Sequence, residues 1–437
     1  MQIFQKEQLN NRNKIEILDI LIIAWTFSNA LLKFFLYFFN IKSSSGQLAI
    51  VYIIVAIISI LLCFRYFSRM IPSSFLSVVL LFATVGVSFV ITFIQHGAFE
   101  SEIVSEFKAY FAMALCTILI TLIISWRKKN DINLNVVFIL VSLLTLISFM
   151  SLFRGDSLTT GGYIRDSSGL IYQNVSYYSA HAFGLTLFHI TETKKVKPLS
   201  WLYRIICFIY LIVQVSTCFL SGGRGGLVLL VILLISSIIL YLGKKAYKIV
   251  VPAGIFIIIV RFTVPWLINT LNINIKGLTR ILSFLNGNLI DDGRSSLYHK
   301  SFVLFQENPI IGNGIGSIFH YLDNYSHNMF LDILVETGIV GLIVFVVLLI
   351  VFIKKDVLLY RQGSLFRFLT IIFICGITLN MFSGYIWVNP HVWLPISVVL
   401  TIRKSVDDMN TSGITDSFAS DTDNHNVISS LDGDNNG

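Results

Sequence analysis

Residues 291–341 read DDGRSSLYHKSFVLFQENPIIGNGIGSIFHYLDNYSHNMFLDILVETGIVG. The stretch begins in a polar loop and ends inside an apolar run of helical length. In order it holds Arg294, a short helical run, a P-x-x-G-x-G turn at 309–314, His327-Asn328 at a predicted helix start, and E-x-G at 336–338. Glycines at such a turn allow tight bends and close backbone approach. The stretch therefore predicts a structured loop that leads into an apolar helix.

The composition on either side of this stretch is that of a membrane protein. Charged residues make up 13% of the chain and hydrophobic residues 55%, whereas soluble domains carry about 25% charged residues. The net charge of +8 comes from basic residues at the ends of apolar runs, which favours topology signals over a nucleic-acid partner. The five cysteines lie in apolar runs without metal-like spacing, so we interpret them as small buried hydrophobic residues.

The fold predicted is an all-α polytopic membrane protein with about 12 transmembrane helices, each needing roughly 20 apolar residues. The first apolar run shows no cleavage pattern typical of a signal peptide, so we interpret it as the first span. The sixth run is the weakest, because it is short and carries His181, and the last two could form a tight hairpin. The predicted spans are 17–39, 47–64, 75–94, 107–125, 134–153, 175–190, 201–221, 225–242, 247–267, 328–353, 365–383 and 386–402.

Lysine and arginine positions predict the orientation. With the N-terminus inside, every even-numbered span returns to a basic loop, and the alternate loops are rich in Ser, Gly, Asn or acidic residues, as the positive-inside rule requires. We therefore expect a multi-pass membrane protein with both termini cytoplasmic. Residues 1–16 form a cytoplasmic tail, 17–402 the membrane domain, and 403–437 a polar tail whose composition predicts disorder.

Two of the predicted outer loops are long, 154–174 and 268–327, and the second far exceeds an ordinary connection. It is not of low complexity and contains two candidate helical pieces, ILSFLNG at 281–287 and SSLYHKSFVLFQ at 295–306. We expect an extracytoplasmic loop whose short helices lie against the membrane or cap a cavity.

The ordered combination of Arg294, P-x-x-G-x-G, His327-Asn328, an acid and E-x-G beside a membrane resembles the C-terminal signature of the O-antigen polymerase and O-antigen ligase family. These are integral membrane glycosyltransferases of bacterial surface polysaccharides. A small-residue turn with an arginine, SGGRGG around Arg224, also matches a family element. The resemblance in span layout covers the chain, and the motifs are confined to Arg224 and 294–341.

The resemblance implies that Arg224 and Arg294 act in catalysis by holding a lipid-linked diphosphate. Arginine suits this role because its planar guanidinium can bind two phosphate oxygens at once. The alternative for Arg224 is a plain turn whose arginine snorkels to the membrane interface. The alternative for Arg294 is an exposed loop residue paired with Asp291 or Asp292.

The resemblance also implies that His327 is a catalytic or acceptor-orienting residue, and a histidine near neutral pKa can take a proton from a sugar hydroxyl. The alternative is an interfacial histidine that caps a helix. Asn328, Asp332 and Glu336 follow at i+4 spacing on one helical stripe. Acids are costly toward lipid, so we expect this stripe to face a cavity and bind substrate.

Further substrate-binding candidates are Arg165 and Asn174, which loosely match a variable arginine-to-asparagine stretch of the family, and Arg261 in the outer half of a span. Lys33 and Arg261 would be compensated by an anionic ligand, or they snorkel to the outer headgroups. Tyrosines at 163, 172, 177 and 178 could stack on sugars, but we favour an interfacial aromatic belt.

The sequence holds no P-loop, G-x-S-x-G or His/Cys metal cluster, and Asp291-Asp292 is only a weak candidate for a sugar-nucleotide metal site. We therefore predict a metal-independent enzyme without a cofactor. The function that the resemblance implies is a polymerase that joins undecaprenyl-diphosphate-linked oligosaccharide repeat units on the outer face of the bacterial inner membrane, with a chain-length regulator and a flippase as pathway partners. The alternatives are an O-antigen ligase acting on lipid A-core and, in another class, a glycolipid flippase or transporter, against which the absence of repeat symmetry and the long loop argue.

Overall fold

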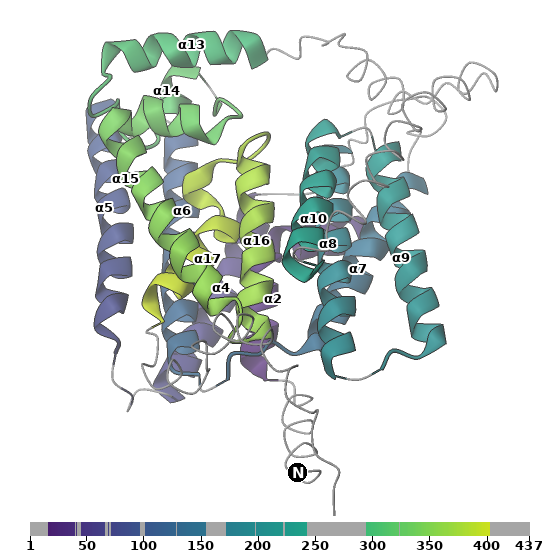
Figure 1. The fold of residues 1–437 in the computed structure, drawn as a ribbon. Helices are drawn as coiled ribbons and strands as arrows, with labels where there is room; N and C mark the ends of the chain where they lie inside the picture. The colour runs from purple at the N-terminus through teal and green to yellow at the C-terminus, as the bar shows by residue number, and fades with distance from the viewer. Residues whose placement is uncertain are drawn as a thin grey trace, which may run out of the picture. The chain divides into compact units, whose positions relative to one another are not determined.

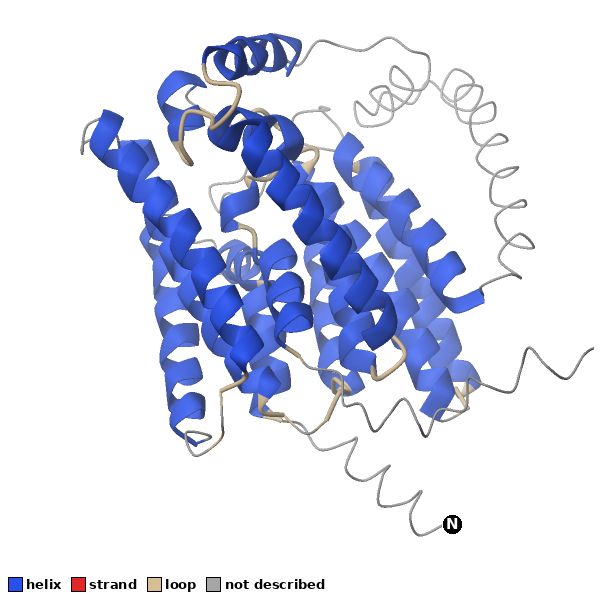
Figure 2. Cartoon of the chain, turned by 60° about the vertical axis from the view of Figure 1, so that its left-hand side comes forward, coloured by secondary structure: helices blue, strands red, loops and turns tan. Residues whose placement is uncertain are grey.

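The computed structural model describes residues 16–39, 41, 45–65, 69, 71–96, 101–127, 129–153, 172–196, 198–221, 223–242, 294–322 and 324–402. The chain divides into two units, Met1–Thr401 and Ile402–Gly437, and the description below concerns the first. Every regular element within these ranges is a helix, and no strand occurs among them (Figures 1 and 2). The all-α class predicted from the sequence is thus confirmed for the described residues.

The helices follow the predicted apolar runs closely. The first group comprises α2 Ile17–Thr26, α3 Ser28–Phe38, α4 Ser45–Arg65, α5 Ser73–His96, α6 Ser101–Ser125, α7 Leu134–Phe153, α8 Tyr172–Val196, α9 Trp201–Leu220 and α10 Arg224–Leu242. The second comprises α13 Arg294–Glu307, α14 Ser317–Leu322, α15 Met329–Leu359, α16 Ser364–Asn380, the 3-10 helix η2 Ile386–Val388 and α17 Pro390–Thr401. The predicted span at 247–267 and the ILSFLNG piece lie outside the described residues.

Five described helices are long and apolar enough to cross a membrane: α5, α6, α7, α9 and α15. A bent pair, α2 with α3, makes a sixth if it counts as one span. Apolar stretches of α4, α10, α16 and α17 are shorter, and the 12 residues of α17 extend only about 18 Å against a hydrocarbon core of about 30 Å. These helices define a multi-pass membrane protein, and the count of about twelve spans stays a prediction.

The first predicted span, 17–39, is not continuous. It breaks at Phe27 into α2 and α3, which are bent by 77°. The ring of Phe27 is buried and meets the rings of His181 and His391 edge-on, at centroid distances of 5.9 and 5.3 Å. Hydropathy shows only that the run is apolar. The bend coincides with the packing of the Phe27 ring against distant residues, which hydropathy does not report.

Helix α8, the weakest predicted span, has a densely buried surface. It packs against α7, α9, α10 and α16 (Figure 1), and its buried residues include Ser176, Ser179, His181 and Glu192. A helix surrounded by protein can carry polar side chains that a lipid-facing helix cannot. Its environment therefore explains why the sequence signal for this span was poor.

Helices α16 and α17 pack against each other as the predicted hairpin, but the connection between them is not a simple turn. Residues 381–389 include η2, and Tyr385, Ile386 and Trp387 are all at most 5% exposed. Non-helical backbone is tolerated in a membrane protein where other protein covers it. This buried connection, residues 381–389, is one wall of the candidate site.

Candidate functional site

A break in α15 receives the glycine-rich turn. Gly338 has φ 64° and ψ −167°, so the helical hydrogen-bond ladder is interrupted there. In an unbroken helix the amides of Ile339 and Val340 would bond the carbonyls of Val335 and Glu336. Those amides bond instead to the carbonyls of Pro309 (2.9 Å) and Ile310 (3.2 Å).

The other half of the exchange satisfies the freed carbonyls. The amide of Asn313 donates to Val335 at 2.9 Å, and the amide of Gly314 donates to Glu336 at 2.8 Å. A Cβ on Gly338 would overlap the carbonyl of Ile310, which leaves no room for a larger residue. P-x-x-G-x-G and E-x-G are therefore two halves of one joint, and α13 and α14 lie beside that end of α15 (Figure 1).

Glu336 lies at the centre of this joint and is fully enclosed, with 1% of its surface exposed. Its Oε1 accepts hydrogen bonds from the Gly316 amide (2.8 Å) and the Tyr385 hydroxyl (2.7 Å), and its Oε2 accepts one from Trp387 Nε1 (2.5 Å). The sequence predicted that Glu336 faces a cavity. Its occupied oxygens favour a scaffold role instead, tying the turn to the buried connection.

Asp332 and Asn328 also bond within the protein. Asp332 is fully buried, and its Oδ1 accepts from the amide (2.8 Å) and hydroxyl (2.5 Å) of Ser326. The Asn328 side chain caps α15 by accepting from the amides of Phe330 and Leu331, the usual role of asparagine at a helix start. Donors from three other segments thus converge on Asp332 and Glu336, whereas Asp332 Oδ2 has no hydrogen-bond partner among the described residues.

His327 lies between these two anchored residues. With φ 61°, it is the one described residue other than glycine that has a positive φ. This left-handed conformation costs an L-residue about 1–2 kcal/mol, although histidine tolerates it better than most. The ring is half-buried and meets Tyr325 edge-on, with centroids 4.5 Å apart.

Tyr325 connects His327 to the buried connection. Its hydroxyl donates to the carbonyl of Ser383 at 3.0 Å, and its ring stacks beside Tyr385 at 6.3 Å. Burial raises the pKa of Tyr325, the charge of Asp332 raises it further, and the positive charge of Arg294 opposes both effects. Arg294, the first residue of α13, therefore lies within electrostatic reach of the Tyr325 hydroxyl.

Arg224 begins α10, in a glycine turn that is pressed onto α8. Ser176 Oγ donates to the carbonyl of Gly223 at 2.8 Å, and a Cβ on Gly226 would overlap Ser176. A Cβ on Gly225 would overlap the hydroxyl of Tyr177 and lie 3.3 Å from Cβ of Phe382 in the buried connection. Only glycine lets this turn approach so closely.

Tyr177 lies near both Arg294 and the turn that carries Arg224. Arg294 acts electrostatically on its hydroxyl, and the residue after Arg224 packs against the same group. Arg224 and Arg294 are each half-buried. The structure thus brings Arg224, Arg294 and His327 to one neighbourhood around Tyr177, Tyr325 and the buried connection. We refer to it as the α13 end.

The remaining predicted residues are less closely placed. Asn174 is half-buried in the first turn of α8, at the α13 end. Lys33 is half-buried on α3, and Arg165 and Arg261 lie outside the described residues. Tyr172 and Tyr178 pack against Val175, and Tyr177 is buried, so packing accounts for these three tyrosines. In the part of the chain that the structure describes, no three His, Cys, Asp or Glu side chains gather as metal ligands would.

Sequence reasoning did not identify Ser326, Tyr325, Tyr385 or Trp387 as site residues. Each bonds or stacks with a residue that the motif does contain, but the partners are up to 51 positions apart in the chain, as for Trp387 and Glu336. Only Ser326 carried a local signal, since it directly precedes His327-Asn328.

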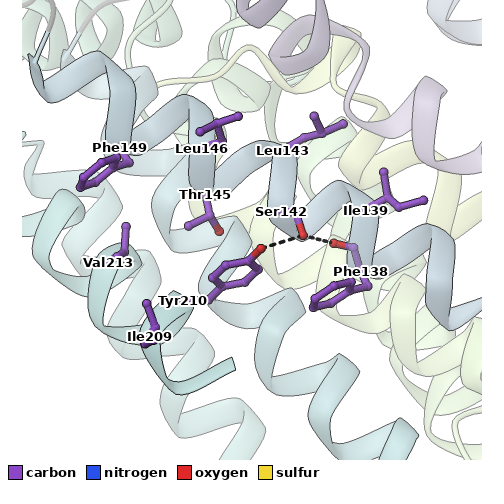
Figure 3. Close-up of a pocket in the computed structure, with 10 residues that line it drawn as sticks. All are labelled: Phe138, Ile139, Ser142, Leu143, Thr145, Leu146, Phe149, Ile209, Tyr210 and Val213. Carbon is purple, nitrogen blue, oxygen red and sulfur yellow. Dashed lines mark hydrogen bonds between the residues drawn. The ribbon is translucent and has the colours of Figure 1, made fainter. Parts of the chain in front are cut away.

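A separate groove of about 490 Å³ lies between α7 and α9 (Figure 3). Its lining is mainly apolar, with the Tyr210 hydroxyl donating to Ser142 Oγ at 3.1 Å across it. None of the predicted site residues lines this groove. Its walls, Phe138, Ile139, Ser142, Leu143, Thr145, Leu146, Phe149, Ile209, Tyr210 and Val213, offer no charged group for chemistry.

Residues 209–346 match a family model described as O-antigen ligase. The matched segment covers about a third of the chain and includes Arg224, Arg294 and His327. No curated protein matches the chain significantly. This match supports the predicted resemblance: residues 209–346 are similar to the O-antigen polymerase and ligase family, whose members are glycosyltransferase-like enzymes.

Proposed function

We propose that the protein is a polysaccharide polymerase that joins undecaprenyl-diphosphate-linked oligosaccharide repeat units at the outer face of a bacterial inner membrane. The observation that carries this proposal is the gathering of Arg224, Arg294 and His327 at the α13 end, inside the segment that matches the family. Two positive charges in the same part of the molecule as a histidine suit transfer of a glycan from a diphosphate leaving group.

In the proposed reaction, a hydroxyl of the lipid-linked acceptor attacks the anomeric carbon of the growing glycan. A new glycosidic C–O bond forms, and the bond between that carbon and the diphosphate oxygen breaks. The hydroxyl proton passes to His327, acting as general base, and the undecaprenyl diphosphate leaves with the bonding electron pair. The arginines hold the diphosphate and stabilise the charge that develops on it.

The direct test uses purified protein and a synthetic undecaprenyl-diphosphate repeat unit as both donor and acceptor. A polymerase yields a ladder of glycans that differ by one repeat. A protein that leaves the repeat unit unchanged while remaining folded would refute the proposal.

The second candidate is an O-antigen ligase, the activity named in the description of the matching family model. A ligase would move a lipid-linked glycan to lipid A-core in one transfer without lengthening it. Supplying both acceptors in one assay separates the two, because the polymerase product is a lengthening lipid-linked ladder and the ligase product is glycosylated lipid A-core. The family match does not support the flippase or transporter alternative.

The proposed orientation puts the α13 end outside and both termini in the cytoplasm, with a chain-length regulator and a flippase as pathway partners. The alternation of basic and polar loops supports this orientation. A phosphatase fused at Asn288 should then be active in cells, and one fused at Lys195 inactive. The opposite activities would mean that the orientation is inverted.

A further inference from the structure

We propose that Ser326 and Asp332 form a clamp that positions the imidazole of His327, and that Asp332 acts through this clamp rather than by binding substrate. The inference rests on the proposed function, since it assigns a positioning device to the histidine of that reaction. It changes the predicted role of Asp332 and adds Ser326, which no motif identified.

The hydrogen bonds at the clamp have a definite direction. The Ser326 hydroxyl has one proton and two acceptors in reach, Asp332 Oδ1 at 2.5 Å and the carbonyl of Asn328 at 3.0 Å. The carboxyl oxygen of Asp332 is the closer and the stronger acceptor, so the Ser326 hydroxyl donates its proton to it. The hydroxyl oxygen then accepts from the Asn328 amide at 3.2 Å, and the Ser326 amide donates to the same Asp332 oxygen at 2.8 Å.

These bonds fix the backbone on both sides of His327. Ser326 is tied to α15 through Asp332, and Asn328 is tied to it through its cap. The residue between them must span the gap with a positive φ, a conformation that persists in a non-glycine residue only when its surroundings impose it. The clamp is the group of contacts that imposes it.

The ring is constrained as well as the backbone. Tyr325 lies edge-on against His327, and its own hydroxyl is anchored to Ser383 in the buried connection. A general base must be held within about 0.5 Å and 10–20° of its working position. Anchors before, after and beside His327 meet that need.

The same helix offers a matched control. Asp356, near the other end of α15, is also buried and accepts from a hydroxyl, that of Thr370, at 3.1 and 3.0 Å. A change at either pair removes a hydroxyl-to-aspartate contact from α15. Only the change at Ser326 or Asp332 should alter the geometry of His327.

The test measures initial rates of ladder formation against acceptor concentration for Ser326→Ala, Asp332→Ala, Thr370→Val and Asp356→Ala. We expect the first two to lower kcat by about 10-fold or more, because small misplacements of a catalytic group are costly, with acceptor KM within threefold of wild type. Ser326→Thr keeps the hydroxyl, so its kcat should be within threefold of the wild-type value. Thr370→Val and Asp356→Ala should keep wild-type kcat per folded molecule.

A double variant decides whether the clamp acts through His327. When His327→Ala is already present, Ser326→Ala should lower the rate less than twofold further, since residues that act as a unit are non-additive. If the rate losses of Ser326→Ala and His327→Ala multiplied in the double variant, the inference would be overturned. A raised acceptor KM with unchanged kcat would also overturn it and would indicate that the clamp residues contact the substrate. Full activity of Ser326→Ala would overturn it too.

A readout without turnover separates this inference from the proposed function. Amide hydrogen exchange at Ser326 and Asn328 should accelerate in Ser326→Ala and Asp332→Ala but not in Asp356→Ala, because hydrogen bonds of the clamp protect these two amides. If the wild-type protein made no ladder, the proposed function would fail, and the exchange data would still decide the clamp. Unchanged protection in both clamp variants would refute it.

Discussion

The two ends of α15 handle buried charge in different ways. At the end opposite α13, two buried acids, Glu192 and Asp19, are matched by bases within the protein, and a third, Asp356, accepts from the Thr370 hydroxyl. Glu192 on α8 accepts from Arg367 at 2.7 and 2.8 Å and from Lys195 at 2.7 Å. Asp19 on α2 accepts from Arg127 at 2.8 Å. Ion pairs of this kind join α2, α8 and α16 to their neighbours.

At the α13 end, the buried acids accept from neutral donors. Asp332 is bonded by a serine, and Glu336 by a tyrosine, a tryptophan and a backbone amide. Among the described residues no basic side chain bonds to either acid, so they are not the partners of Arg224 or Arg294. The comparison teaches that charge at the opposite end holds helices together, whereas the arginines at the α13 end are placed independently of these acids.

The largest effect expected at the α13 end is that of His327. We predict that His327→Ala lowers ladder formation by at least about 10²-fold, the lower range for loss of an acid-base group. His327→Asn should lose as much while keeping the fold, because asparagine tolerates a positive φ. The measurement is the ladder formed by membranes matched for protein amount.

Two other histidines serve as controls for that prediction. His299 is exposed on α13 and His320 half-buried on α14, so His299→Ala and His320→Ala should keep most activity. A complete ladder from His327→Ala, or a loss of ladder formation confined to either control variant, would show that His327 is not the catalytic histidine.

A smaller effect is expected from replacing the guanidinium groups of Arg224 and Arg294. Arg224→Ala and Arg294→Ala should each lower ladder formation by about 10-fold or more, in line with losing a charge-assisted bidentate contact. Arg224→Lys and Arg294→Lys should recover only part of this, because lysine keeps the charge but not the planar donor pair. If both alanine variants turned over at the wild-type rate, neither arginine would hold the diphosphate.

The smallest effect concerns the joint between the glycine-rich turn and α15. Gly338→Ala should destabilise the protein by about 2 kcal/mol or more, from a backbone conformation (φ 64°, ψ −167°) that is essentially restricted to glycine and from the overlap with Ile310. Gly86→Ala in α5 is the matched control, since its Cβ would meet only Tyr110 at an ordinary 3.5 Å and alanine favours a helix. Thermal unfolding in detergent measures both, and equal unfolding temperatures would argue against the joint.

The sequence predicted most described helices because a bilayer imposes long apolar runs on the chain. It did not predict the breaks at Phe27 and Gly338, since both depend on contacts with segments distant in sequence. The motif named Arg224, Arg294 and His327 as candidates for the site. The sequence did not predict the hydrogen-bond donors to Asp332 and Glu336, because periodicity places acids on one face without saying which donors cover that face.

The most direct test compares one arginine from each end. The Arg294→Ala and Arg367→Ala variants are purified separately by the same procedure. The unfolding temperature and the ladder formation per folded molecule are measured for each. We predict that Arg294→Ala loses about 10-fold or more in ladder formation at a near-normal unfolding temperature. Arg367→Ala should unfold much more easily, since breaking a buried ion pair costs about 3–5 kcal/mol, yet keep its activity per folded molecule. Equal stability losses with no selective loss of activity in Arg294→Ala would contradict a substrate-binding α13 end.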